Sequence, residues 1–152
     1  MSSRFTLRRR VAFSETDAAG IVHFSHFYRY MEDTEHAFIR SLGFSVVTKI
    51  GDEHYGWPRV HSECEHTRPL KFEDEFEVLL LVRQINTKSI TYDFVFTKLG
   101  DPAPQRIATG SITAVCVRRR ADGTMAAVVI PAPIAAKITP ANPDEYPLNS
   151  TP

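Results

Sequence analysis

The chain has 152 residues, and its 18 Lys and Arg side chains balance 18 Asp and Glu side chains, so the formal net charge is zero with the six His neutral. A composition of 43% hydrophobic and 24% charged residues is that of one ordinary globular domain and excludes the disordered, collagen-like and membrane classes. Balanced charge also argues against general binding to DNA, RNA or anionic lipid, because these partners attract basic proteins.

The residues after Met1 lack the apolar stretch of a signal peptide, and no 18 apolar residues run together, so we expect a cytoplasmic location. Cys64 and Cys116 do not belong to a Cys-x-x-Cys pair. We therefore expect two reduced, partly buried thiols rather than a disulfide or a metal site.

A first strand is predicted over residues 5–13, because apolar side chains share one face there, which only Arg9 interrupts. The apolar residues of this face are Phe5, Leu7, Val11 and Phe13. Small and polar residues over 14–20 then predict a turn-forming loop.

The only strong helix is predicted between Ser25 and Leu42, where large apolar residues recur at helical spacing and form one buried stripe. The stripe consists of Phe27, Tyr30, Met31, Phe38 and Leu42. Ser25 or the preceding turn is expected to cap the start, and Gly43 to take the left-handed position that ends the helix. The acidic residues expected on its outer face are Glu32, Asp33 and Glu35.

Most of the remaining chain has the alternating pattern of strands. The predicted strands are 57–67, which is the weakest, 74–85, 89–98, 106–118 and 124–130. Hairpin-length connections join the second to the third and the fourth to the fifth, the latter through Asp122-Gly123. The stretch before them contains Gly51 and Gly56 and is expected to be a mobile connection.

Six of the ten prolines lie in the segment from 131 to the end of the chain. Proline lacks a backbone donor and disfavours helix at the preceding residue, so this segment is not expected to extend a sheet or form a long helix. We expect a domain over 1–130 and a proline-rich tail over 131–152.

One early helix followed by consecutive strands predicts an α+β fold, in which a twisted antiparallel sheet wraps around a single helix. Such a sheet leaves an open edge and an uncovered face. Pairing of two protomers would cover them, so we expect a homodimer or a larger assembly.

One carboxylate, Asp17, lies in a tight loop directly before the predicted helix. A helix N-terminus presents unpaired backbone N–H groups and a partial positive charge, which suit an anion or a developing oxyanion. A nearby carboxylate can attack a carbonyl carbon held there, or direct a water at it. Position alone, however, favours a cap or turn residue.

The run TDAAGIV over 16–22, followed by an aromatic-rich helix start and by Glu32, resembles the 4-hydroxybenzoyl-CoA thioesterase family of hotdog-fold acyl-CoA thioesterases. Members of that family have a strand, a Thr/Cys-Asp-x-x-Gly-x-Val loop and a helix of the form Tyr-x-x-aromatic-x-acidic. The resemblance covers about 5–130 and is most specific over 13–32.

The resemblance implies a curved sheet around a central helix, dimers or dimers of dimers with a continuous sheet, and active sites at the dimer interface. It also implies hydrolysis of a short-chain or aromatic acyl-CoA, with Asp17 as nucleophile or general base. A backbone N–H near Phe24 would stabilise the oxyanion, while Gly20 and Val22 would lie against the substrate. It implies no metal and no cofactor, because coenzyme A is part of the substrate.

The histidines depart from the family pattern or lie outside it. His23 stands where the family usually has Tyr or Trp, and it could act as an acid or base near neutral pH. Alternatively, it lines the acyl pocket or bonds a backbone carbonyl. His26, His61 and His66 lack metal-ligand spacing, so surface or strand roles are expected for them.

Basic residues should meet the phosphates of coenzyme A. Lys88 and Ser89 occupy the hairpin position where related enzymes have a basic cluster followed by Ser. Arg118, within a run of three arginines, is a second candidate, although such runs at turns are often simply solvated.

The acyl group should enter an apolar slot between protomers. Trp57, Val60 and His61 are expected to form its walls, although Trp57 is equally compatible with a core position. No acidic or basic pair for the acyl group is evident, which favours a neutral acyl group.

Two other functions fit the same sequence. A non-catalytic acyl-CoA or acyl-carrier-protein binding module would share the fold, but it would have no need for Asp17. A hotdog dehydratase acting on hydroxyacyl thioesters would instead use His23 as its base.

Overall fold

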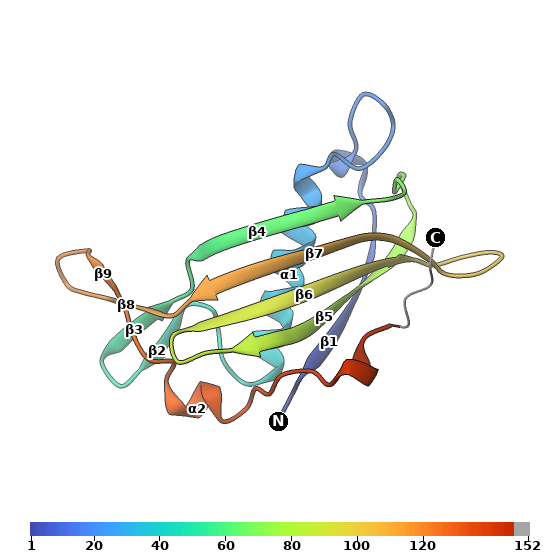
Figure 1. Ribbon diagram of the computed structural model, residues 1–152. Coiled ribbons are helices and arrows are strands. Elements are labelled where there is room, and N and C mark those ends of the chain that lie inside the picture. Colours follow the sequence, from blue (N-terminus) through green and yellow to red (C-terminus); the bar gives the residue numbers. More distant parts are fainter. Residues whose placement is uncertain (148–152) are drawn as a thin grey trace.

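A five-stranded antiparallel sheet packs against one long helix, α1 (Ser25–Ser41), in the computed structural model, which describes residues 1–147 (Figure 1). The strand order is β1-β5-β6-β7-β4, so β1 and β4 are the edges. The bounds are β1 (Arg4–Arg10), β5 (Glu75–Ile85), β6 (Ser89–Lys98), β7 (Gln105–Val115) and β4 (Arg59–His66). This architecture confirms the predicted α+β class.

A second sheet of four short strands, in the order β2-β3-β8-β9, lies at one end of the first (Figure 1). Its strands are β2 (Thr48–Ile50), β3 (Glu53–Gly56), β8 (Val117–Arg119) and β9 (Met125–Ala127). The prediction of a mobile connection before residue 57 was therefore wrong, because β2 and β3 form a hairpin there.

The predicted strand over 106–118 is also divided. The buried Cys116 separates β7, which pairs with β6 and β4, from β8, which pairs with β3 and β9. Its N–H donates to the carbonyl of Lys88, and its carbonyl accepts from Val128. β-forming residues continue without a break on both sides of Cys116, so the sequence pattern did not reveal the division.

The apolar stripe of α1 is buried as predicted, with every member at most 8% exposed. Gly43 follows the helix with φ +88°, which confirms the predicted left-handed end. Of the two predicted caps, the structure has the preceding turn, whose carbonyls accept the first N–H groups of the helix, while the Ser25 side chain makes no capping bond. The outer-face prediction was wrong for one residue, because Glu35 is 1% exposed and pairs with Arg59 instead of facing solvent.

The N-terminal strand ends earlier than predicted, at Arg10, and Phe13 begins a short 3-10 helix with 74% of its surface exposed. Arg9 lies on the inner side of β1, with its guanidinium 5.1 Å from the centre of the Tyr30 ring and an ion pair to Asp33. A paired guanidinium over an aromatic face can occupy an apolar surface, which explains the interrupted alternation.

The described part of the proline-rich tail packs along the domain. It contains the short helix α2 (Ala132–Ala135) and a 3-10 turn (Pro143–Glu145), and Ile134 and Ile138 join the core at 1% and 3% exposure. The boundary at residue 130 stays a prediction, and Pro152 lies outside the described residues. Among the described helices, none is both long and apolar enough to cross a membrane.

The helix packs tightly against the sheet at Gly110 of β7, where a Cβ atom would lie 2.5 Å from Sδ of Met31 and 3.1 Å from the carbonyl oxygen of Glu63. Gly110→Ala is therefore expected to lower the free energy of unfolding by roughly 1–3 kcal/mol through overpacking. Urea denaturation measures this change. Gly56→Ala is the control, since its Cβ meets only Val117 at an ordinary 3.6 Å. Equal stability of the two variants would contradict the close approach.

Candidate active site

The loop before α1 is a tight turn around Asp17. The Asp17 N–H donates to the carbonyl of Ile21 over 2.8 Å, and the Gly20 N–H donates to the carbonyl of Asp17 over 3.0 Å. Gly20 has φ +78°, a conformation that side chains disfavour. Oδ1 of Asp17 accepts the Ala19 N–H over 2.8 Å, so the carboxylate is held in place and half-buried.

Backbone bonds attach this loop to a distant segment of the chain. The Val22 N–H donates to the carbonyl of Leu70 over 2.8 Å, and Ile21 forms a β-bridge with Lys71. The His23 N–H donates to the carbonyl of Glu15 over 2.9 Å, which closes the loop at its base. The segment that follows β4 therefore lies directly beside the Asp17 loop.

A pocket of about 470 Å³ opens between these two segments. Its lining residues are Asp17, Ile21, Val22, Phe24, Phe27, His66, Thr67, Arg68 and Pro69. Most of these side chains are apolar, and a few polar groups converge among them, as is typical of small-molecule sites. The volume also lies within the usual range of such sites, roughly 300–1,000 Å³.

The start of α1 supplies a hydrogen-bond donor at this pocket. Phe24 precedes the helix and lines the pocket, and within residues 1–147 its N–H donates to no protein acceptor. The next N–H, that of Ser25, donates to Nδ1 of His23 over 3.4 Å, and Ser25 does not line this pocket. The Phe24 N–H, together with the positive end of the helix, can stabilise an oxyanion.

His23 is exposed and does not line the pocket. Its Nδ1 lies 2.8 Å from Oγ of Ser25, and its ring centre lies 4.6 Å from that of Phe24. Its side chain therefore contacts residues at the helix start, including Phe24, which itself lines the pocket.

The structure does not bring the other predicted binding residues to this pocket within one protomer. Trp57 is a core residue at 6% exposure, whereas Val60 is 63% exposed. His61 lies on the surface of β4, with its Nε2 3.4 Å from Oε2 of Glu63. Lys88, Ser89 and Arg118 lie near the other end of the sheet, beyond the start of β4. That end is separated from His66 by the length of β4, about 20 Å.

Sequence reasoning missed several residues of the pocket. His66 is exposed at the end of β4, as its predicted surface or strand role requires, but its place in the pocket was not predicted. Its ring meets Phe27 edge-on with the ring centres 4.5 Å apart. No role was predicted for Arg68 or Pro69. They are about 50 residues from Asp17 in the chain, and only the register of β4 and the Val22–Leu70 bond place them beside it.

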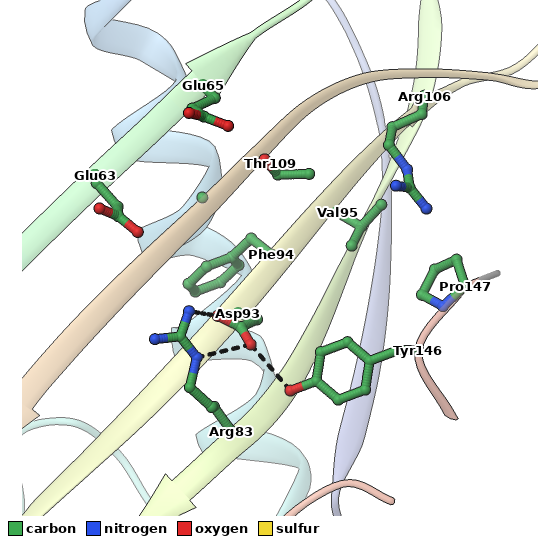
Figure 2. Close-up of a pocket in the computed structure, with 11 residues that line it drawn as sticks. Glu63, Glu65, Arg83, Asp93, Phe94, Val95, Arg106, Thr109, Tyr146 and Pro147 are labelled. Atoms are coloured by element: carbon green, nitrogen blue, oxygen red, sulfur yellow. Dashed lines mark hydrogen bonds and ion pairs between the residues drawn. The ribbon is translucent and has the colours of Figure 1, made fainter. Parts of the chain in front are cut away.

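A second pocket, of about 340 Å³, lies on the face of the sheet away from α1 (Figure 2). There Asp93 accepts from Nε of Arg83 and from the Tyr146 hydroxyl, each over 2.9 Å. Burial and the bond to Asp93 raise the pKa of Tyr146 to about 12. These groups satisfy one another and hold the tail against the sheet, and none of the predicted site residues lies among them.

No three His, Cys, Asp or Glu side chains come together as metal ligands anywhere in residues 1–147. The groups available for chemistry at the first pocket are one carboxylate, one free backbone N–H, an imidazole and a guanidinium.

Comparison with known proteins points to one family. A model described as the thioesterase-like superfamily matches residues 11–138. A 1,4-dihydroxy-2-naphthoyl-CoA hydrolase from Prochlorococcus marinus is 31% identical over 102 residues, which cover 62% of this chain and 66% of the relative.

Solved structures agree in fold. A gentisyl-coenzyme A thioesterase has a TM-score of 0.74 and 29% identity, covering 88% of this chain and 98% of its own. The 4-hydroxybenzoyl-CoA thioesterase of Pseudomonas sp. strain CBS-3 has a TM-score of 0.75 and 14% identity, covering 89% of this chain and 99% of its own. These likenesses confirm the predicted hotdog fold.

Proposed function

The chain belongs to the thioesterase-like superfamily and is a thioester hydrolase, and from this we propose that it converts a short-chain or aromatic acyl-CoA to the free acid and coenzyme A at the pocket beside Asp17. The observation that carries the proposal is the meeting of a held carboxylate, the unpaired N–H of Phe24 at the helix start and apolar walls in one pocket. No cofactor is needed, because the thiol of coenzyme A leaves readily.

The thioester carbonyl is proposed to sit against the Phe24 N–H, with its carbon facing Asp17. As a general base, Asp17 takes a proton from water while the water oxygen bonds to the carbonyl carbon. The helix end stabilises the oxyanion until the C–S bond breaks and the thiolate leaves. As a nucleophile, Asp17 forms an anhydride with the acyl group, and water then hydrolyses it.

The pocket walls support an aromatic acyl group. Phe27 and His66 present two rings at right angles, and aromatic groups pack well against ring edges and faces. The relatives named above act on gentisyl-CoA and 1,4-dihydroxy-2-naphthoyl-CoA, which both carry aryl groups.

A homodimer would complete the site. If the free edges of two β4 strands pair antiparallel, the start of one strand meets the end of the other. The partner's Lys88, the partner's Arg118 and the partner's His61 would then approach the pocket that one protomer forms with Asp17. This arrangement accounts for predicted binding residues at both ends of β4.

The dimer makes a measurable prediction. Specific activity should fall on dilution in proportion to the fraction of dimer, because a monomer lacks the binding residues that the partner would supply to each site. Light scattering gives the molar mass over the same concentration range. A chain that is monomeric at concentrations where it turns over at full rate would contradict the proposal.

The function itself is tested by release of free thiol from a panel of acyl-CoA thioesters that includes benzoyl-CoA, 4-hydroxybenzoyl-CoA and butyryl-CoA. Hydrolysis of at least one aromatic or short-chain member is expected. Tight binding without thiol release would favour the binding module, and an enoyl product that His23→Ala abolishes would favour the dehydratase; either result overturns the proposal.

A further inference from the structure

Arg68 lies in the same pocket as Asp17 and is held there by its backbone. The Thr67 and Arg68 N–H groups both donate to the carbonyl of Ile107, over 2.9 and 3.2 Å. Two residues later, Leu70 accepts from Val22 in the Asp17 loop. The segment that carries Arg68 is therefore hydrogen-bonded to β7 on one side and to the Asp17 loop on the other.

The guanidinium of Arg68 makes no hydrogen bond or ion pair within the part of the chain that the structure describes. Arg59 and Arg83 are paired with carboxylates, whereas within residues 1–147 Arg68, like the exposed Arg40, is not, so Arg68 is distinguished by its place in this pocket. Asp17 is the one carboxylate among the residues that line this pocket, and it forms no ion pair with Arg68 within 4.0 Å. Arg68 is exposed, so water satisfies its guanidinium when the pocket is empty. A ligand that fills the pocket would displace part of this water and could take over some of its five donors.

We propose that Arg68 binds an anionic substituent on the acyl group, so that the preferred substrates are acyl-CoA thioesters with a second carboxylate or an ionised hydroxyl. This inference rests on the proposed function. Guanidinium groups bind carboxylates through paired, charge-assisted hydrogen bonds, and the apolar walls of the pocket would strengthen such bonds.

The phosphates of coenzyme A are the other anions that Arg68 could meet. They are separated from the thioester by the whole pantetheine arm, whereas Arg68 and Asp17 line one pocket of about 470 Å³. An anion within reach of both the reacting carbonyl and Arg68 therefore belongs to the acyl group. The sequence shows no evident charged pair for the acyl group, which favoured a neutral acyl group. Arg68 was not recognised as part of the site, because it is remote from Asp17 in the sequence.

The test compares two thioesters that differ in charge but little in shape, 4-carboxybenzoyl-CoA and 4-methylbenzoyl-CoA. Loss of a charged hydrogen bond predicts that Arg68→Met lowers kcat/KM for the carboxylated substrate by roughly 10- to 100-fold and leaves the methylated one within about threefold. Arg68→Lys should recover part of the loss, since it restores charge without the paired donors. Arg40→Met, an exposed change at the far end of α1, is the matched control and should alter neither substrate.

The same acyl groups attached to pantetheine, which lacks the nucleotide phosphates, identify the source of the anion. The effect of Arg68→Met should persist on these thioesters. If it disappears, Arg68 binds coenzyme A, and if both acyl groups lose rate equally, Arg68 acts on Asp17 or on the fold; either result overturns the inference while the hydrolase stands. A wild-type protein that hydrolyses none of the thioesters would overturn the proposed function as well.

Discussion

Asp17→Asn is expected to lower kcat for acyl-CoA hydrolysis by about 10²- to 10⁴-fold, the usual loss when a general base or nucleophile is removed. The amide has the shape of the carboxylate, and its oxygen can still accept the Ala19 N–H, so the loop should keep its conformation. It can neither take a proton from water nor attack the thioester. Thiol release under saturating substrate measures kcat directly.

Two controls accompany this variant. Asp52→Asn makes the same chemical change on the exposed turn between β2 and β3 and should leave kcat unchanged. The melting temperature of Asp17→Asn should match that of the wild type. If Asp17→Asn keeps more than about a third of the wild-type kcat, then Asp17 is not the catalytic carboxylate.

A single turnover in ¹⁸O-labelled water separates the two roles of Asp17. A nucleophilic carboxylate forms an anhydride, and attack of water on its aspartyl carbonyl leaves label in the protein. A general base transfers only a proton, so all of the label appears in the acid product. Mass spectrometry of the peptide that contains Asp17 distinguishes these outcomes.

The second large effect concerns stability. Arg59→Met is expected to lower the free energy of unfolding by roughly 3 kcal/mol at pH 8, because it leaves the Glu35 carboxylate buried without its cation. Glu35 has 2% of its side chain exposed, and Arg59 joins it from the first residue of β4, where it also donates to the Trp57 carbonyl. The pair therefore connects α1 to the edge strand. Urea denaturation measures the loss.

The loss should depend on pH. Burial raises the pKa of Glu35 from 4.5 to about 7, although the Arg59 guanidinium opposes this. Since the folded pKa is raised, the stabilisation from the bound proton is full below about pH 4.5 and is lost as pH rises through about 7. Arg59→Met should therefore be less destabilising at pH 5 than at pH 8.

The matched control for this pair is Glu35→Gln, which removes the titrating group and should flatten the fall in wild-type stability between pH 4.5 and 7. In the double variant with Arg59→Met, the destabilisation should be smaller than in Arg59→Met alone, because no charge is left buried. Equal losses for Arg59→Met at pH 5 and pH 8 would show that the pair does not control stability as described.

The parts of the fold that depend on near neighbours in the chain were predictable. The stripe from Phe27 to Leu42 follows from helical spacing alone, and every member is buried. The hairpin of β5 and β6 follows from alternation and a short connection, and β6 begins and ends where expected. In the candidate site, the turn around Asp17 and the adjoining helix start depend on bonds between residues a few positions apart.

The predictions that were wrong concern residues whose environment depends on a partner far away in the sequence. Glu35 has the position of a solvated helix residue, but Arg59 allows it to be buried. The predicted strand over 106–118 is an unbroken run of β-forming residues, but the bonds of Cys116 to Lys88 and Val128 divide it between two sheets. Neither partner is visible in the local sequence, because charge pairing and sheet pairing act through space.

By itself the sequence determined the fold class and the turn around Asp17, since both rest on local spacing that backbone geometry converts directly into structure. The catalytic role of Asp17 stays a prediction, which the family resemblance supplied. The tertiary structure alone decided what surrounds that carboxylate. The register of β4 on β7, and the bond from Val22 to Leu70, bring His66 and Arg68 to Asp17, and they leave Lys88 and Arg118 at the far end of the sheet. Register is set by the burial of one whole face of the sheet, so it depends on the complete chain and on no single motif.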